Sequence, residues 1–117
     1  MAGDIYRDGL IGCDVGGVTI RRYYPWGAKR IPWSRVQSVE RFELTAAQGR
    51  GRIWGTTSPR YWCNLDPARP RKRVGFVLHT GRPVRPVVTP DDPDGFEAAV
   101  RAQAGGVPVT AGRKHVL

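Results

Sequence analysis

Histidine, cysteine, lysine and methionine are all scarce in this chain of 117 residues, which has two histidines, two cysteines and one methionine. Its lysines are Lys29, Lys72 and Lys114. The histidines and cysteines do not stand at spacings typical of metal ligands, so the sequence predicts neither a metal site nor a cofactor. We interpret Cys13 and Cys63 as small buried residues, with a disulfide between them as the alternative.

Long apolar runs are absent as well. No segment is long and hydrophobic enough to span a membrane, and the first residues lack the basic and apolar regions of a signal peptide. We therefore expect a cytoplasmic protein, with peripheral attachment to a membrane as the alternative. A chain of 117 residues has the size of one domain and is long enough to bury a core without disulfides.

Acidic residues are in the minority. The chain has 19 basic and 10 acidic residues and a formal net charge of +9. Such an excess favours contact with phosphate groups, anionic lipids or acidic protein surfaces. Arginine is far more frequent than lysine, and glycine, alanine and proline are abundant, as a GC-rich genome also produces. Whether the charge serves binding or reflects genome composition therefore stays open.

Short stretches of strand-like sequence alternate with turns over most of the chain. The clearest strand covers residues 18–24, which are rich in β-branched and aromatic side chains. Its alternation predicts one face with Val18, Ile20, Arg22 and Tyr24. Further strands are expected at residues 10–14, 28–32, 37–44, 51–55 with 60–65, 73–79 and 84–88.

Two of these strands are irregular. In residues 37–44, Val39 falls on one face while Phe42 and Leu44 fall on the other, and a bulge or a sharp bend would reconcile them. Pro86 lies inside the last strand and cannot donate a backbone hydrogen bond. It therefore predicts an edge position or a bulge.

The one segment with helical periodicity runs from Asp92 to Gln103. Asp92 can cap the first turn through its side chain, and Pro93 suits the first helical position. The neighbouring acidic residues would stabilise the start of the helix, because negative charge interacts favourably with the positive end of the helix dipole. The alternative is that these residues bind a metal ion. Gly95 opposes the helix by about 1 kcal/mol relative to alanine. The stripe at helical spacing consists of the apolar residues Phe96, Ala99 and Val100, followed by Gln103.

These elements predict a mainly β fold with one C-terminal α-helix. About seven antiparallel strands would form a partly open barrel or sandwich, with the helix capping one opening. We expect a single domain over residues 1–104. Residues 105–117 are expected to form a short, basic, disordered tail.

Three features of the expected order of strands and helix are similar to those of a known family. They are Ile31-Pro32-Trp33-Ser34-Arg35-Val36 before the fourth strand, the strand count, and Val88 to Phe96 at the strand-to-helix junction. With them the chain resembles a bacterial pleckstrin-homology-like (PH-like) domain over residues 5–104. The resemblance implies a seven-stranded, partly open barrel that is plugged at one end by the C-terminal helix. Residues 52–55 and 61–66 are also similar to a segment of small uncharacterised actinobacterial proteins.

The ligand does not follow from this resemblance. Eukaryotic members that bind phosphoinositides have a Lys-x-Arg type pattern around the first two strands. The Val15-Gly16-Gly17 turn has no basic residue, and Arg21 and Arg22 match the pattern only loosely. Other members of the superfamily bind peptides, so the fold alone does not define the function.

Catalytic motifs are not recognisable. Nothing in the sequence brings His79 or His115 together with a serine and an aspartate, and no signature surrounds Cys63. No glycine-rich loop opens a helix in the way a phosphate-binding loop does. We therefore expect a protein that is not an enzyme.

Tryptophan and arginine gather in three places that we take as candidate binding sites. A tryptophan beside an arginine is a usual composition for a binding hot spot and allows cation–π contact. The alternatives are that Trp54 and Trp62 belong to the core, that Trp26 folds back on its hairpin, and that the basic turn is only solvated. The candidates are Arg52, Trp54, Arg60 and Trp62 in one group, Trp26, Lys29 and Arg30 at a hairpin tip, and Arg71 and Lys72 in a basic turn.

The sequence thus predicts a non-enzymatic interaction module that binds a protein or peptide partner through loop tryptophan and arginine residues. The alternative is an anionic lipid or a phosphorylated ligand on the basic surface. Nucleic acid ranks below both, because the aromatic residues form no clear stacking platform. An exposed edge strand would allow a homo-oligomer.

Overall fold

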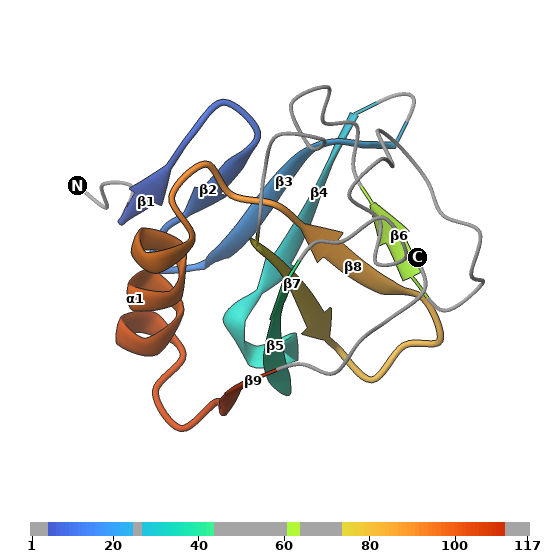
Figure 1. Ribbon diagram of the computed structural model, residues 1–117. Coiled ribbons are helices and arrows are strands. Elements are labelled where there is room, and N and C mark those ends of the chain that lie inside the picture. Colours follow the sequence, from blue (N-terminus) through green and yellow to red (C-terminus); the bar gives the residue numbers. More distant parts are fainter. Residues whose placement is uncertain (1–4, 25–26, 44–60, 64–73, 112–117) are drawn as a thin grey trace.

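Two β-sheets and one α-helix make up the protein in a computed structural model, which describes residues 5–24, 27–43, 61–63 and 74–111 (Figure 1). For residues 61–63 and 111 only the backbone is described. The first sheet has the order β1 (Tyr6–Arg7), β2 (Ile11–Cys13), β3 (Gly17–Tyr24) and β4 (Gly27–Pro32). The second has the order β6 (Tyr61–Cys63), β8 (Arg85–Val88), β7 (Val74–His79), β5 (Ser38–Glu43) and β9 (Val109–Ala111). A short 3-10 helix, η1 (Trp33–Arg35), joins β4 to β5, and α1 (Pro93–Gln103) lies between β8 and β9 in the chain.

The predicted class, mainly β with one helix near the C-terminus, is confirmed. The first sheet is antiparallel throughout, as expected. The second is mixed, because β5 pairs in parallel with β9 and β6 pairs in parallel with β8. The two sheets are not hydrogen-bonded to each other through any described strand, so they do not close into a barrel. The expectation was an antiparallel, partly open barrel or sandwich; two of the strand pairings are parallel instead, and the sheets do not form the barrel.

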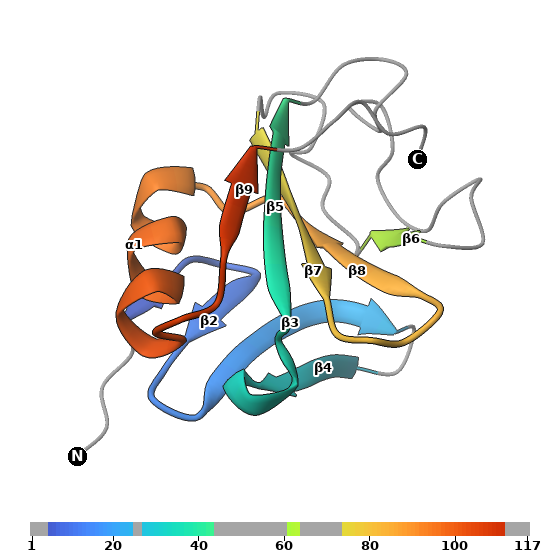
Figure 2. The ribbon, with the colours of Figure 1, turned by 90° about the horizontal axis from the view of Figure 1, so that it is seen from below.

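The sheets face each other, and α1 stands at one side of them. Figure 2 shows β5, β7 and β8 of the second sheet on one side and β3 and β4 of the first on the other, with the helix beside β2. Side chains from both sheets and from the helix fill the space between these layers. The large side chains of this core that are fully buried are Ile11, Val18, Ile20, Val39, Phe76, Leu78, Val88, Phe96 and Val100.

Phe96 of α1 connects the two sheets. The helix begins as predicted, since the Asp92 carboxylate accepts a hydrogen bond from the Gly95 N–H at 3.1 Å. Phe96 is completely buried. Its ring centroid lies 5.9 Å from that of Tyr6 in the first sheet and 4.8 Å from that of Phe76 in the second. Phe96, the first residue of the stripe predicted from the sequence, is thus buried against strands of both sheets.

The N-terminal strand fixes the entrance to α1. The Tyr6 hydroxyl accepts from the Asp92 N–H at 3.0 Å and donates to the Asp8 carboxylate, which also accepts from the Asp91 N–H at 2.9 Å. Burial raises the pKa of Tyr6, so this hydroxyl keeps its proton. Gly95 suits this crowded turn, because a Cβ atom there would lie 2.4 Å from Asp92 Oδ2. Because Gly95 has no side chain, it fits beside Asp92, and this offsets the poor helix propensity of glycine.

An irregularity in β3 changes which residues face the core. The β3–β4 register shifts between Ile20 and Tyr24, and Arg22 has a φ of 56°. Beyond this point Tyr23 is buried while Arg22 is exposed. The predicted face of Ile20, Arg22 and Tyr24 is therefore wrong after Ile20, because the extra residue of a bulge reverses the alternation.

The apparent conflict within β5 has a different explanation from the predicted bulge. The β5–β7 ladder runs without a register shift, and Val39 and Phe42 are both buried. Val39 belongs to the main core, whereas Phe42 is buried together with Val77 and Val87 outside that cluster. The second sheet is thus buried on both faces, which a strand can satisfy with apolar residues on either side.

Pro86 does not lie on an edge strand, since β8 stands between β6 and β7. Its neighbour in β6 is Trp62. The ladder from β8 to β7 pairs only Val87 and Val88. Pro86 thus stands just beyond this ladder, where a missing backbone donor costs no pairing with β7.

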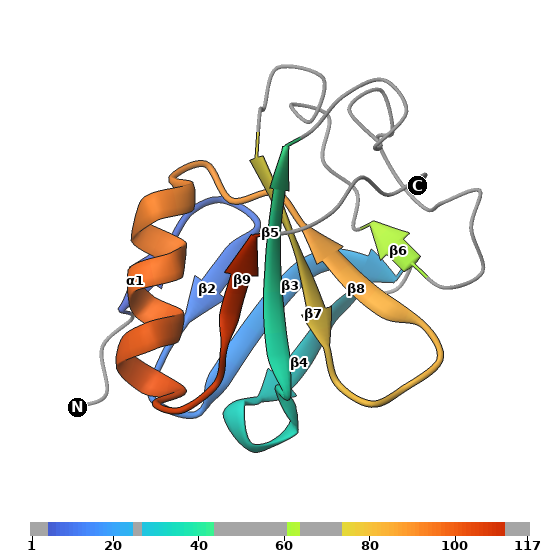
Figure 3. The same ribbon diagram turned by 60° about the horizontal axis from the view of Figure 1, so that its bottom comes forward.

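The chain beyond residue 104 returns to the second sheet. Strand β9 pairs with β5, and the Val39 N–H donates to the Pro108 carbonyl at 3.0 Å (Figure 3). Sequence analysis had placed residues 105–117 in a tail, but residues 109–111 are part of the fold. Residues 112–117 lie outside the described residues.

Candidate functional site

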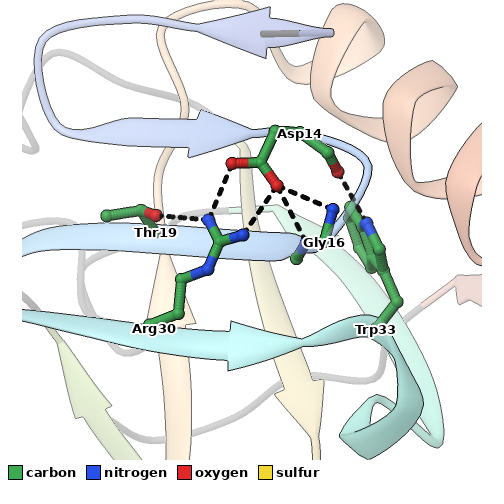
Figure 4. Close-up of polar contacts among 6 residues, drawn as sticks. Asp14, Gly16, Thr19, Arg30 and Trp33 are labelled. Atoms are coloured by element: carbon green, nitrogen blue, oxygen red, sulfur yellow. Dashed lines mark hydrogen bonds and ion pairs between the residues drawn. The ribbon is translucent and has the colours of Figure 1, made fainter. Parts of the chain in front are cut away.

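Arg30, predicted at a binding tip, lies in an internal network on the first sheet (Figure 4). Its Nη1 and Nη2 atoms donate to the two oxygens of the Asp14 carboxylate at 2.8 and 2.7 Å. Nη1 also donates to Thr19 Oγ1 at 2.9 Å. The same carboxylate accepts from the Gly16 and Gly17 N–H groups at 2.8 and 3.1 Å, which closes the turn between β2 and β3.

Trp33 extends this network into the core. It is buried, and its Nε1 atom donates to the Asp14 carbonyl oxygen at 2.8 Å. The hydrogen bond from Arg30 lowers the pKa of Asp14 to about 2, so the carboxylate is charged at neutral pH. Arg30 therefore ties β4 to the β2–β3 turn and has its charge compensated by a neighbour.

Lys29 lies against two tyrosines near the tip of the β3–β4 hairpin. Its Nζ atom donates to the Tyr24 hydroxyl at 3.2 Å and stands 5.4 Å from the ring centroid of Tyr23 and 5.7 Å from that of Tyr24. The two rings meet edge to face, with centroids 4.9 Å apart. We call Tyr23, Tyr24 and Lys29 the Tyr–Lys cluster. A cation held over aromatic faces is an ordered surface of the kind that binding sites use.

Most of the other predicted site residues lie outside the part of the chain that the structure describes. For Trp62 the structure gives the backbone, which lies opposite Pro86 in the sheet. The side chain of Trp62 lies outside the description, as do the other members of the predicted tryptophan and arginine group. The predicted residues outside the described part of the chain are Trp26, Arg52, Trp54, Arg60, Arg71 and Lys72.

A site that the sequence analysis missed lies at the turn between β7 and β8. It is a cavity of about 320 Å³, which we call the basic cavity. From the sequence we expect strands at residues 73–79 and 84–88 and assign no binding role to the residues between them. Two arginines three residues apart in a glycine-bearing turn were the available signal. The lining residues are Gln37, His79, Gly81, Arg82, Pro83 and Arg85.

The cavity wall is ordered by contacts between β5 and β7. The Gln37 N–H donates to the His79 carbonyl at 2.8 Å, and His79 Nε2 lies 3.2 Å from Glu40 Oε1. Gly81 has a φ of 77°, a conformation that glycine adopts without strain. A Cβ atom at Gly81 would stand 2.7 Å from Gln37 Nε2, so the missing side chain makes room for this amide.

Two searches of the described residues bear on other kinds of site. They contain no group of three or more histidine, cysteine or acidic side chains placed to hold a metal ion. They also include no helix with the length and apolar character needed to cross a bilayer. Cys13 is buried and forms no disulfide, in agreement with the interpretation of this residue, while the side chain of Cys63 is not described.

Comparison with protein-family models, with curated proteins and with solved structures found no match to this chain.

Proposed function

We propose that the chain is a non-enzymatic PH-like interaction module that binds a protein or peptide partner at the tip of its β3–β4 hairpin. The observation that carries this proposal is the Tyr–Lys cluster. Its lysine is held against two aromatic rings immediately beside residues 25–26, where the sequence has a proline and a tryptophan. Ordered aromatic and cationic groups lose little conformational freedom on binding, which favours recognition of a partner.

The fold supports the PH-like part of the proposal. Two facing sheets, with a C-terminal helix whose Phe96 contacts both, agree with the general plan of such domains. The mixed second sheet and the strand that follows the helix depart from that plan. The module would use the scaffold to hold the hairpin and would bind without chemical conversion of its ligand.

Site-specific photo-crosslinking tests this function directly. A photoreactive amino acid replaces Ala28, which is exposed in β4 beside the cluster, and the protein is irradiated in its native cells. The matched control places the same amino acid at Ala102, which is exposed on α1. We expect discrete adducts with a protein at position 28 and none at position 102. Equal adducts at both positions, or none at position 28, would contradict the proposal.

A second measurement separates binding from folding. The Trp26→Ala substitution should abolish the adducts formed from position 28 while it changes the free energy of unfolding by no more than about 0.5 kcal/mol, as is usual for surface substitutions. A large loss of stability would instead show that Trp26 belongs to the core of the hairpin.

A further inference from the structure

The basic cavity differs from the Tyr–Lys cluster in its sheet and in its chemistry. It lies at the end of the β7–β8 hairpin, in the lower right of Figure 1, while the tip of the β3–β4 hairpin lies in the upper part. Two arginines and a glutamine line the cavity, and its lining contains no acidic residue among the described residues. Its function therefore does not rest on that proposed for the cluster.

The positive charges of the two arginines in the cavity are available to a ligand. Within the described part of the chain, neither the Arg82 nor the Arg85 side chain forms a hydrogen bond or an ion pair with another residue. Arg30 and Arg41 differ in this respect, because each has a carboxylate partner within 3 Å. The nearby carboxylate of Glu40 is engaged by His79. A ligand anion in the cavity would thus replace water rather than compete with an internal ion pair.

We propose that the basic cavity binds a phosphomonoester group. Guanidinium groups pair with phosphate through two parallel hydrogen bonds, and two of them supply a charge of +2. A phosphomonoester carries a charge of about −1.5 to −2 at neutral pH on three acceptor oxygens, so it matches both arginines and leaves an oxygen for the Gln37 amide. A carboxylate, with one charge, would leave one guanidinium uncompensated.

The size of the cavity agrees with a small group. Its 320 Å³ is at the lower end of the range of about 300–1,000 Å³ that small-molecule sites occupy. The phosphate would enter the cavity, and the remainder of the ligand would extend past the exposed Arg82. The phosphomonoester could belong to a soluble molecule or to a lipid head group, since both present the same dianion.

The test is an NMR titration of the ¹⁵N-labelled full chain with inorganic phosphate at constant ionic strength. We expect saturable shifts confined to residues 79–85 and Gln37. Each of the substitutions Arg82→Gln and Arg85→Gln should weaken binding about tenfold or more, because a hydrogen bond to a charged group is lost. Arg22→Gln is the matched control, since Arg22 is an exposed arginine of the first sheet and should change binding less than twofold.

Vesicles identify the source of the phosphate. Co-sedimentation with vesicles containing phosphatidic acid, lost in the Arg82→Gln/Arg85→Gln double variant, would assign the site to a lipid head group. Binding of inorganic phosphate without binding to these vesicles would assign it to a soluble phosphomonoester. Shifts that do not saturate, or that persist unchanged in a folded double variant, would overturn the proposal. Dispersion of the NMR spectrum reports whether each variant is folded.

Discussion

The substitution Phe96→Ala tests the contact between α1 and the two sheets most directly. Phe96 is completely buried and contacts Tyr6 on one sheet and Phe76 on the other. Replacing a buried phenylalanine by alanine costs about 3–5 kcal/mol, because apolar burial is lost and a cavity remains. A domain of this size loses about 4 °C in Tm per kcal/mol, so we expect a decrease of about 12–20 °C.

The assay is urea unfolding followed by circular dichroism, with the free energy of unfolding obtained by linear extrapolation. Ala98→Gly is the matched control, because Ala98 is exposed on the same helix and its replacement costs about 1 kcal/mol through helix propensity alone. If Phe96→Ala costs no more than Ala98→Gly, the burial of the phenylalanine between the sheets is not what holds the helix in place.

Three other changes have defined outcomes. Gly17→Ala should destabilise the protein by about 1–3 kcal/mol or more in urea unfolding, because the added Cβ would stand 2.2 Å from a carbonyl oxygen of β4. Gly12→Ala is the control, because a Cβ at Gly12 would have open space around it. Asp14→Asn should be less stable than wild type at pH 7 but nearly equal to it near pH 2. The reason is that a carboxyl group whose pKa is lowered from 3.8 to about 2 stabilises the fold above this range and loses that effect as the pH falls through it. A difference in the free energy of unfolding between the two proteins that stays constant with pH in urea unfolding would contradict this. Deletion of residues 105–117 should lower the Tm because it removes β9 from the second sheet, and a deletion of residues 112–117 that lowers it equally would refute the role of β9.

The parts of the fold that the sequence predicts correctly depend on local signals. The start of α1 follows from Asp92 and Pro93, which act within one helical turn, and its buried face follows from the spacing of Phe96, Ala99 and Val100. The β2–β3 and β3–β4 hairpins of the first sheet follow from short strands separated by glycine-bearing turns, whereas β1 was not predicted. These signals lie within a few residues of the feature they determine, so a single sequence contains them in full.

The parts that the sequence does not predict depend on residues far apart in the chain. The hydrogen bond between the Asp92 N–H and the Tyr6 hydroxyl joins positions separated by 86 residues. The parallel pairing of β9 with β5 likewise has no local signature, because a strand of three residues is too short for alternation to be recognised. The bulge in β3 rests on Arg22 in a conformation that glycine adopts more readily. Tertiary contacts select it, and the local sequence gives no indication of it.

The candidate site shows the same division. Trp26, Lys29 and Arg30 were grouped because they are close in the sequence, yet Arg30 pairs with Asp14, 16 positions away, and Lys29 lies against Tyr23. Composition can identify residues that are able to bind a partner. It cannot show which of them have an internal partner, because that depends on how the strands are paired.

The net charge of +9 is therefore a poor measure of what this protein can bind. Arg30 and Arg41 contribute two of its positive charges, but each faces a carboxylate at less than 3 Å, and a ligand would have to break that contact first. Breaking an exposed ion pair costs only about 0.2–1 kcal/mol, yet it also removes a link between separate elements of the fold. The side chains of Arg82 and Arg85 form no ion pair with a described residue, and both residues line the basic cavity. A few positive charges with defined positions and no internal partner can thus be more informative about a ligand than the total charge, and this holds whether that total arose by selection or from genome composition.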